Sequence, residues 1–340
     1  MQPLHSTKQR IGILFGGQSA EHNVSLQSAR SVLAALNTSL FEPVLIKITR
    51  QGAWHLLQTI DGKVTPQNRL LVDVGAGTFY IADGERIQIN VVFPVLHGPF
   101  GEDGTLQGLI KLTGLPCVGC DVLASAVGMD KDMTKRLLRD AGLPVANFKV
   151  AKSIAGCDVT RITKELGLPL FVKPANMGSS VGVSKVISAA EFLPALTLAL
   201  QYDKKAIIET AIIGSEIECA VLGNDDPKVS VPGRIAFTDE FYTYDAKYNE
   251  TLGTQLEIPA KLSPTIQKRA QDLALKAYQV LECRGLARVD MFVTQSGDVI
   301  INEINTMPGF TKFSMYPQLW QASGLSYTAL ITELIQLAQQ

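Results

Sequence analysis

Two neighbouring segments near the C-terminal end of the chain have the pattern of a well-packed β-hairpin. Residues 288–293 (RVDMFV) and 299–305 (VIINEIN) are mainly apolar and rich in β-branched residues. Residues 295–298 (QSGD) between them are typical of a hairpin turn. The sequence therefore predicts two adjacent antiparallel strands, and this pairing constrains which side chains can meet.

Polar side chains interrupt both predicted strands at the same spacing. Because side chains alternate between the two faces of a strand, Arg288 and Asp290 share one face, and Glu303 and Asn305 share one face of the partner. If these two faces coincide, two carboxylates, an amide and a guanidinium converge, and oxygen ligands of this kind suit Mg²⁺. The alternative is an Arg–Asp pair at a sheet edge facing water. The surrounding isoleucines favour a packed hairpin and hence a metal site.

Composition excludes several classes of protein. The 340 residues are 46% apolar and 19% charged, which is typical of a globular protein with more than one domain. A formal net charge of −1 gives no electrostatic reason to expect nucleic acid or an anionic membrane as partner. No apolar run is long enough to span a membrane, and the first residues do not resemble a signal peptide, so we expect a cytoplasmic protein.

The five cysteines include one C-x-x-C pair, Cys117 and Cys120. A zinc site would require two further ligands, and a thioredoxin-like site would require the pair at the start of a helix. Here the pair follows Gly114-Leu115-Pro116, which is typical of a helix end. We therefore expect free thiols without a metal or redox role.

Strand and helix patterns alternate along the first 120 residues, which favours a mostly parallel α/β sheet there. Strands are expected at Arg10–Gly16, at Val44–Ile48 and at Ile87–Leu96, and Gly114 is expected to end a short helix. Further along, Asp130 is expected to cap one helix, and Ser263 another.

The region after residue 215 contains one long stretch without periodicity. Strands are expected at residues 216–223 and 229–235, followed by the aperiodic residues 238–259. Aperiodic stretches of this length are usually lids, binding loops or disordered segments.

A Gly/Ser-rich loop follows the strand that ends at Lys173-Pro174. Its backbone N–H groups can bind phosphate oxygens, and Lys173 can add a charge, although a hairpin tip would explain the same composition.

Gly16-Gly17 lacks the G-x-G-x-x-G pattern, so a dinucleotide site there has little support. Glu21 stands where the next helix begins, either facing a ligand or as a solvated cap. His97 follows a strand end, where α/β sheets bind ligands.

Seven motifs extend over almost the whole chain in the order found in one enzyme family. The chain therefore resembles the D-alanine–D-alanine ligases of the ATP-grasp superfamily. The motifs are FGGQSAEHNVS (15–25), HGPFGEDGTLQG (97–108), MDK (129–131), VKPANMGSSVGVS (172–184), YDAKY (244–248), ARVDMF (287–292) and NEINTMPGF (302–310). The last two motifs occur widely in ATP-grasp enzymes, whereas the first two and YDAKY indicate the dipeptide ligases.

The resemblance implies an α/β fold with a three-domain ATP-grasp architecture and a Rossmann-like first domain. The expected domains are residues 1–121, 122–214 and 215–340, with residues 238–258 as a lid that keeps water from the acyl phosphate. It also implies that one D-alanine attacks the γ-phosphate of ATP, and that a second D-alanine attacks the resulting acyl phosphate. The product, D-alanyl-D-alanine, is a peptidoglycan precursor, and the family suggests a homodimer.

The resemblance also assigns nucleotide and metal contacts by matching motifs. Glu209 and the Ile212 backbone match the adenine-binding hinge, and Glu216 matches the ribose contact. Two Mg²⁺ ions, with Mn²⁺ as an alternative, would bridge the phosphate oxygens. The residues matched to ATP are Lys131, Lys173, Ser180, Glu209, Ile212 and Glu216, and those matched to the metal are Asp290, Glu303 and Asn305.

Contacts to the two amino acids follow in the same way. Glu21, positioned by Ser179 and Tyr248, would bind the ammonium group of the first D-alanine. Arg288 and the Gly309 N–H would stabilise the oxyanion, a role suited to a guanidinium and a backbone donor at a sharp turn. Substrate contacts are further expected from His97, Lys247, Ser314 and the N–H of Met315, the last three at the carboxylate of the second D-alanine.

Alternatives exist for the identity of the second substrate and for the class of protein. Tyr248 favours D-alanine as acceptor, the alternative being a D-alanine–D-lactate or D-alanine–D-serine ligase, and Phe313 stands where many members have His. A non-catalytic nucleotide sensor would lack some of the residues proposed for catalysis, and all are present. A nicotinamide-dependent dehydrogenase would require the absent G-x-G-x-x-G motif.

Overall fold

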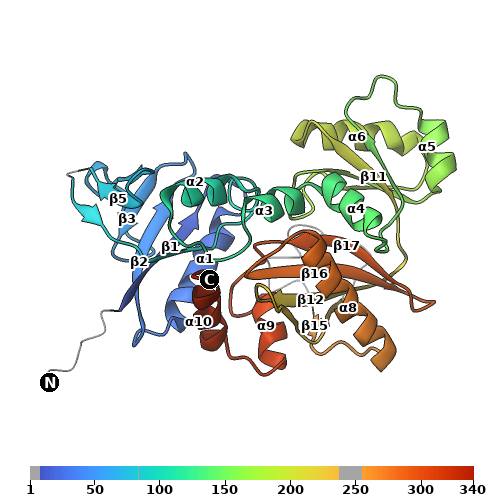
Figure 1. Ribbon diagram of the computed structural model, residues 1–340. Coiled ribbons are helices and arrows are strands. Elements are labelled where there is room, and N and C mark those ends of the chain that lie inside the picture. The colour runs from blue at the N-terminus through green and yellow to red at the C-terminus, as the bar shows by residue number, and fades with distance from the viewer. Residues whose placement is uncertain (1–7, 83, 237–254) are drawn as a thin grey trace.

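The computed structural model describes residues 8–82, 84–236 and 255–340, which form three groups of helices and strands (Figure 1). An N-terminal α/β unit lies at one end of the molecule in Figure 1. A small central unit and a larger C-terminal sheet lie together at the other end. The expected α/β class with several sheets is confirmed.

The N-terminal unit is built on a mostly parallel sheet, as expected. Its four strands lie in the order β3 (Trp54–Leu57), β2 (Phe41–Ile48), β1 (Gln9–Gly16) and β7 (Val91–Pro94). β1 pairs in parallel with β2 and β7, and β3 is antiparallel to β2. Helix α1 (His22–Ala35) follows the turn at Gly16-Gly17. Both glycines have positive φ, and a Cβ at Gly16 would lie 2.3 Å from the Ile48 carbonyl oxygen.

The strand expected over residues 87–96 is confirmed at Val91–Pro94, but it does not extend back to Ile87. The segment is divided between two sheets, because Asn90 redirects the chain: its Oδ1 accepts from the Arg10 N–H at 2.7 Å, and its own N–H donates to the Arg10 carbonyl oxygen at 2.8 Å. The first part joins a separate three-stranded sheet with a short 3₁₀ helix beside it. These elements are η1 (Pro66–Asn68), β4 (Leu70–Asp73), β5 (Thr78–Ile81) and β6 (Arg86–Ile87).

The central unit is an antiparallel sheet covered by helices. Its strands lie in the order β10 (Ser184–Val186), β9 (Leu170–Pro174), β11 (Ala206–Thr210) and β8 (Phe148–Ala151). Helices α5 (Val159–Leu166) and α6 (Ala189–Tyr202) pack on it and bury a core confined to this unit. Pro194 lies inside α6, which the structure accommodates in a continuous helix.

The C-terminal sheet is also antiparallel. Its main strands lie in the order β15 (Gln255–Glu257), β14 (Gly233–Ala236), β12 (Gly214–Leu222), β16 (Leu286–Thr294) and β17 (Val299–Asn305), with β13 (Lys228–Val229) paired to β12. The strand expected at residues 229–235 is interrupted at residues 230–232, and its two parts, β13 and β14, both pair with β12. Helix α8 (Pro264–Val280) packs on this sheet, and so do α3 (Val122–Met129) and α4 (Lys131–Asp140).

The expected helix ends are confirmed. Gly114, with φ of 72°, ends helix α2 (Thr105–Thr113). The Asp130 carboxylate accepts from the N–H groups of Asp132 and Met133 at the start of α4. Ser263 caps α8 by accepting from the Ile266 N–H.

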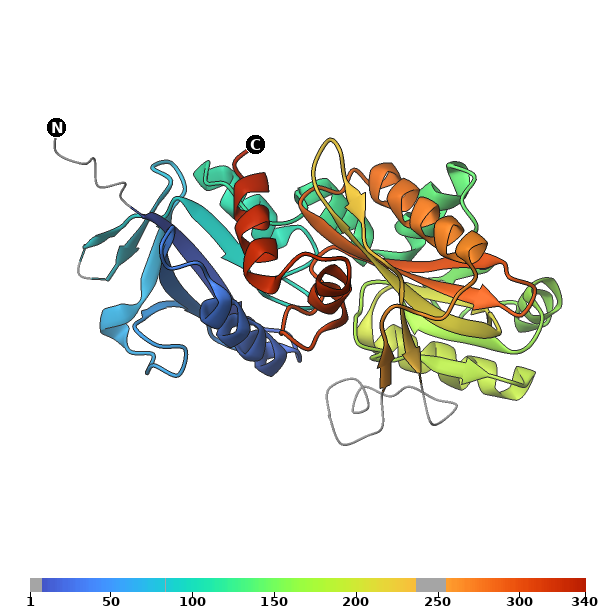
Figure 2. The same ribbon diagram turned by 90° about the horizontal axis from the view of Figure 1, so that it is seen from below.

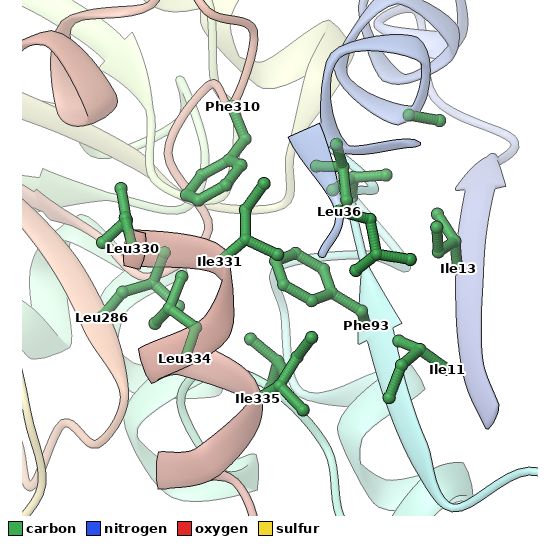
Figure 3. Close-up of a cluster of buried hydrophobic side chains, with 14 of the residues drawn as sticks. Ile11, Ile13, Leu36, Phe93, Leu286, Phe310, Leu330, Ile331, Leu334 and Ile335 are labelled. Carbon is green, nitrogen blue, oxygen red and sulfur yellow. The ribbon is translucent and has the colours of Figure 1, made fainter. Parts of the chain in front are cut away.

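The last two helices return to the N-terminal unit. Helices α9 (Met315–Ala322) and α10 (Tyr327–Leu337) share one hydrophobic core with β1, β7 and α1 (Figure 2). Figure 3 shows this core, in which Ile331 of α10 lies between Phe93 of β7 and Phe310 of the loop after β17, and Leu334 lies beside Leu286. The first and last parts of the chain are therefore packed together, whereas the domain boundaries expected from the sequence stay predictions.

Candidate active site

The predicted hairpin forms, and its four polar residues lie in two opposite pairs. Strands β16 and β17 are antiparallel, with Arg288 opposite Asn305 and Asp290 opposite Glu303. Opposite residues of an antiparallel pair have neighbouring side chains. The structure therefore brings together the four side chains that alternation placed on two separate strands.

A β-bulge aims Glu303 away from the core. The register shifts between Asp290 and Met291, so that Asn302 is an extra residue in β17. Ile301 and Ile304 are both buried although they are three residues apart, a spacing that an unbroken alternation would place on opposite faces. The bulge was not expected from the sequence, and it adds Asn302 to the residues beside the site.

Arg288 lies between two carboxylates. Its Nε and Nη2 donate to Oδ1 and Oδ2 of Asp290 at 2.7 Å each, and its Nε lies 2.8 Å from Glu218 Oε2. Burial would lower the pKa of Arg288, but the charges of Asp290 and Glu218 raise it well above its ordinary value. The guanidinium is thus held charged and fixed. Sequence reasoning missed Glu218, a carboxylate within the apolar stretch of β12.

The expected metal ligands are engaged by cationic and amide groups of the chain. Asn305 Nδ2 donates to Asp290 Oδ2 at 2.9 Å, and Lys131 Nζ lies 3.4 Å from Glu303 Oε2. In the described residues no group of three or more His, Cys, Asp or Glu side chains has a metal-binding arrangement. Two carboxylates and an amide oxygen still fit Mg²⁺, which takes its remaining ligands from water and phosphates.

The Gly/Ser-rich loop joins the N-terminal and central units. Ser179 and Ser180 have φ of 51° and 60°, a left-handed conformation that is uncommon outside glycine. Ser179 Oγ donates to Glu21 Oε1 at 2.6 Å, and Lys131 Nζ donates to the carbonyl oxygen of Met177 at 2.8 Å. The Glu21–Ser179 pair that the resemblance implies is therefore present, as is a lysine beside the loop.

A cavity of about 570 Å³ lies between the central unit and the C-terminal sheet. Five Lys and Arg side chains and three Glu side chains line it, which gives a net charge of +2. Such a lining suits a polyanionic ligand. All six residues matched to ATP line this one cavity, together with Ser179 and Glu303: they are Lys131, Lys173, Ser180, Glu209, Ile212 and Glu216.

Two buried lysines share the Glu209 carboxylate at the inner end of the cavity. Lys173 Nζ contacts Oε1, and Lys135 Nζ lies 3.1 Å from Oε2. Burial raises the pKa of Glu209, but the charges of Lys135 and Lys173 outweigh this and lower it to about 2. Burial lowers the pKa of Lys135, which Glu209 offsets only in part. Sequence reasoning missed Lys135, which stands four residues after Lys131, a spacing that places both on one helix face.

The charge of Glu21 acts on a second carboxyl group, Glu102, near the expected first amino-acid subsite. Glu102 Oε1 accepts from the Gly98 N–H at 2.7 Å, and Gly98 also adjoins Glu21, since a Cβ there would lie 2.8 Å from Glu21 Oε2. Burial and then the charge of Glu21 raise the pKa of Glu102 to about 8. This end of the site is therefore rich in carboxyl groups, as binding of an ammonium group requires. Glu102 was not among the expected site residues.

Both ring nitrogens of His97 contact the protein. Nε2 lies 3.0 Å from Ser28 Oγ, and Nδ1 lies 3.3 Å from the carbonyl oxygen of Met307. Burial lowers the pKa of His97, against the raising effect of Glu21. His97 thus joins the N-terminal unit to the turn after β17, and its substrate contact stays a prediction.

The turn after β17 leads into the N-terminus of α9. A Cβ on Gly309 would lie 3.1 Å from Ser314 Oγ, which accepts from the Thr311 N–H at 3.0 Å. Met315 is the first residue of α9, and N–H groups of a first helical turn have no acceptor within the helix. Ser314 and Met315 therefore stand where a carboxylate can bind.

Two expected site residues, Lys247 and Tyr248, lie outside the described residues, as does most of the expected lid. The expected free thiols are present, and the absence of a metal or redox role stays a prediction. Cys117 and Cys120 are both free, and their Sγ atoms face the carbonyl oxygens of Val118 and Leu286.

Comparisons with known proteins match this combination of fold and site. The family model described as D-ala D-ala ligase N-terminus matches residues 10–120, and that described as D-ala D-ala ligase C-terminus matches residues 137–336. The chain belongs to the D-alanine–D-alanine ligase family, which confirms the resemblance drawn from the motifs.

Individual relatives cover almost the whole chain. D-alanine--D-alanine ligase of Shouchella clausii is 51% identical over 97% of this chain and 95% of its own length, and D-alanine--D-alanine ligase A of Escherichia coli K12 is 50% identical over 97% and 96%. Among solved structures, VanG D-Ala:D-Ser ligase from Enterococcus faecalis has a TM-score of 0.89 at 38% identity, covering 98% of this chain and 100% of its own. The D-alanine-D-alanine ligase from Coxiella burnetii has 0.85 at 37%, covering 97% and 95%.

Within its described residues, the structure contains no helix with the length and apolar character needed to cross a membrane.

Proposed function

We propose that this protein joins two molecules of D-alanine into D-alanyl-D-alanine at the expense of ATP, for peptidoglycan precursor synthesis. The observation that carries this proposal is the cavity with all six residues matched to ATP, whose Ser179 contacts Glu21 of the N-terminal unit. Relatives of about 50% identity are named for the same reaction. The use of ATP and the family also support a cytoplasmic location.

In the first step, the carboxylate of one D-alanine attacks the γ-phosphate of ATP and displaces ADP. Glu21, held by Ser179, binds the ammonium group of that D-alanine and fixes its carboxylate toward the cavity. Lys131 and Lys173 bind the phosphate oxygens, which requires Lys131 to turn from Glu303, and Lys173 from Glu209. Phosphoryl transfer depends mainly on alignment and charge neutralisation, which these contacts supply.

In the second step, the amine of another D-alanine attacks the acyl phosphate, and phosphate leaves the tetrahedral intermediate. Arg288, fixed by Asp290 and Glu218, and the Gly309 N–H stabilise the oxyanion. Ser314 and the Met315 N–H at the start of α9, with Lys247, bind the carboxylate of the attacking D-alanine, and Tyr248 supports the Glu21–Ser179 pair.

Asp290, Glu303 and Asn305 would hold Mg²⁺, with Mn²⁺ as an alternative. A divalent ion there supplies charge that neutralises the phosphate oxygens. The proposal is supported by the hard oxygen donors that the register of β16 and β17 brings together.

Product analysis tests this function. The protein is incubated with ATP, Mg²⁺ and equal amounts of D-alanine, D-lactate and D-serine, and the products are identified by mass spectrometry. We expect D-alanyl-D-alanine, with one ADP and one phosphate released per dipeptide. Preferential formation of D-alanyl-D-lactate at neutral pH would overturn the assignment of the acceptor from Tyr248, and the absence of any D-alanyl product would overturn the proposed reaction.

We further propose a homodimer, as the family suggests. Leu112 of α2 and Leu123 of α3 are 69% and 57% exposed and are available for an apolar contact. Sedimentation analysis at micromolar concentration is expected to give about twice the mass of one chain, and a monomer at all concentrations would exclude the dimer.

A further inference from the structure

Lys135 is a cationic residue of the nucleotide cavity for which the reaction outlined above has no role. Its side chain is 1% exposed, compared with 9% for Lys173 and 12% for Lys131. Its Nζ lies 3.1 Å from Glu209 Oε2, without the full geometry of a hydrogen bond. A buried ammonium group whose hydrogen bonds are incomplete costs free energy, and an apolar residue would pack there at lower cost. Its position in the cavity wall therefore indicates a role in ligand binding.

The contacts of Glu209 suggest what that role is. In the ligand-free arrangement Glu209 is shared, with Oε1 toward Lys173 and Oε2 toward Lys135. When Lys173 turns to the phosphates of ATP, it leaves the Glu209 carboxylate. A buried carboxylate without a cation nearby takes up a proton or becomes costly to keep ionised. Glu209 then needs a counter-ion that does not leave.

Two other lysines of this region, Lys131 and Lys205, already have partners. Lys131 contacts Glu303 and the carbonyl oxygen of Met177, and Lys205 contacts Asp130 and Asp132. Lys135 is held in the middle of α4 and lies near Oε2 of Glu209, whereas Lys173 contacts Oε1. It is therefore placed to remain with Glu209 during nucleotide binding.

We propose that Lys135 is a positioning residue that keeps the Glu209 carboxylate ionised and aimed at the 6-amino group of adenine after Lys173 has moved to the phosphates. This inference rests on the proposed function, in which Glu209 accepts a hydrogen bond from the base. The pKa of Glu209, lowered to about 2 by both lysines, agrees with a carboxylate that stays ionised. Lys135 thereby contributes to base selectivity without touching the base.

The test is the preference for adenine over hypoxanthine nucleotides, since hypoxanthine carries an oxygen where adenine carries the amino group. ADP and IDP binding are measured by calorimetry for the wild type, Lys135→Met and Lys135→Gln. We expect each variant to bind ADP about 10-fold more weakly and to lose about 10-fold in the ADP:IDP ratio, as for a hydrogen bond to a charged group. The KM for D-alanine should change by less than about twofold.

Lys149→Met is the matched control. Lys149 also pairs with a glutamate, Glu165, but at the surface of the central unit on strand β8. This variant should keep the wild-type ADP:IDP ratio. A folded Lys135 variant with an unchanged ratio, verified by its thermal melting curve, would overturn the inference. The ligase reaction of the wild type is measured separately, so failure to form dipeptide would count against the proposed function instead.

A double-mutant cycle separates positioning from a general structural effect. Glu209→Gln removes the charge that Lys135 is proposed to balance, so Lys135→Met should cost much less ADP affinity in that background than in the wild type. If the two substitutions weaken ADP binding independently, Lys135 does not act through Glu209.

Discussion

The two ends of the proposed site have opposite electrostatic character. At the nucleotide end, lysines outnumber carboxylates, and Glu209 is shared between Lys135 and Lys173. At the amino-acid end, the charge of Glu21 adds to burial in raising the pKa of Glu102, whose Oε1 accepts from the Gly98 N–H. One end is thus suited to a polyphosphate and the other to an ammonium group. Each end has an excess of groups whose charge is opposite to that of its ligand. Binding of both substrates therefore neutralises this excess.

Arg288 lies between these two ends and differs from both. It is fixed by two carboxylates on neighbouring strands, so its position does not depend on a ligand. A preformed donor of this kind requires no rearrangement when negative charge develops on the reacting carbonyl group. The lysines proposed to bind the nucleotide change their ionic partners on binding, whereas the guanidinium proposed to stabilise the transition state is fixed beforehand.

Glu303→Gln gives the largest expected effect at the nucleotide end. Loss of one carboxylate from the proposed metal site should lower kcat by roughly 10³-fold, because phosphate charge is no longer neutralised. ADP release in the presence of D-alanine measures this, and Mg²⁺ binding by calorimetry should weaken in parallel. Glu282→Gln, an exposed glutamate after α8, serves as control. Full turnover by Glu303→Gln would show that the metal assignment is wrong.

Glu21→Gln should act at the amino-acid end alone. Removal of the carboxylate weakens a charged hydrogen bond to the substrate ammonium group, so the KM for the first D-alanine should rise about 10- to 100-fold. The KM for ATP should stay within about twofold of the wild type. Initial rates over a grid of both substrates separate these values. Equal increases in both would contradict the division of the site into two ends.

Glu102→Gln should have the smallest effect, seen in the pH dependence of stability. The pKa of Glu102 is about 8 in the folded chain and higher than its ordinary value of 4.5. Between these pH values the folded state binds a proton that the unfolded state has released, so wild-type stability should fall as pH rises from about 4.5 through 8. Gln can still accept from the Gly98 N–H, and the variant should lose this component of the slope.

Thermal or urea unfolding at pH 5, 7 and 9 measures the slope for both proteins. The exposed Glu85→Gln variant should keep the wild-type slope. If Glu102→Gln unfolds with the same pH dependence as the wild type, the carboxyl pair at the amino-acid end does not have the proposed electrostatic character.

The sequence predicts which residues of the hairpin form the site better than it predicts the register of the two strands. Alternation was sufficient to pair Arg288 and Asp290 with Glu303 and Asn305, because all four lie on one hairpin. It could not reveal the bulge at Asn302, which depends on where the two strands shift register. Glu218 and Lys135 were missed since each occurs singly among residues whose partners are far away in sequence.

Long-range pairing also limited the prediction of the fold. The sequence predicts a strand that ends at Lys173-Pro174, but it does not show that this strand, β9, is antiparallel to β11. Likewise, α10 packs against β7 and α1, which lie more than 200 residues earlier in the chain, and the sequence analysis predicts neither this helix nor its contacts. Such contacts follow from packing of the whole chain and have no local signal.

That packing of α10 has a consequence for motion. The N-terminal sheet and the C-terminal helices share one core, so they are expected to move as a single rigid body. The central unit has a separate core, and the Ser179–Glu21 hydrogen bond connects it to the N-terminal sheet. A hinge that opens the nucleotide cavity would therefore rotate the central unit, and the two ends of the polypeptide would remain in place.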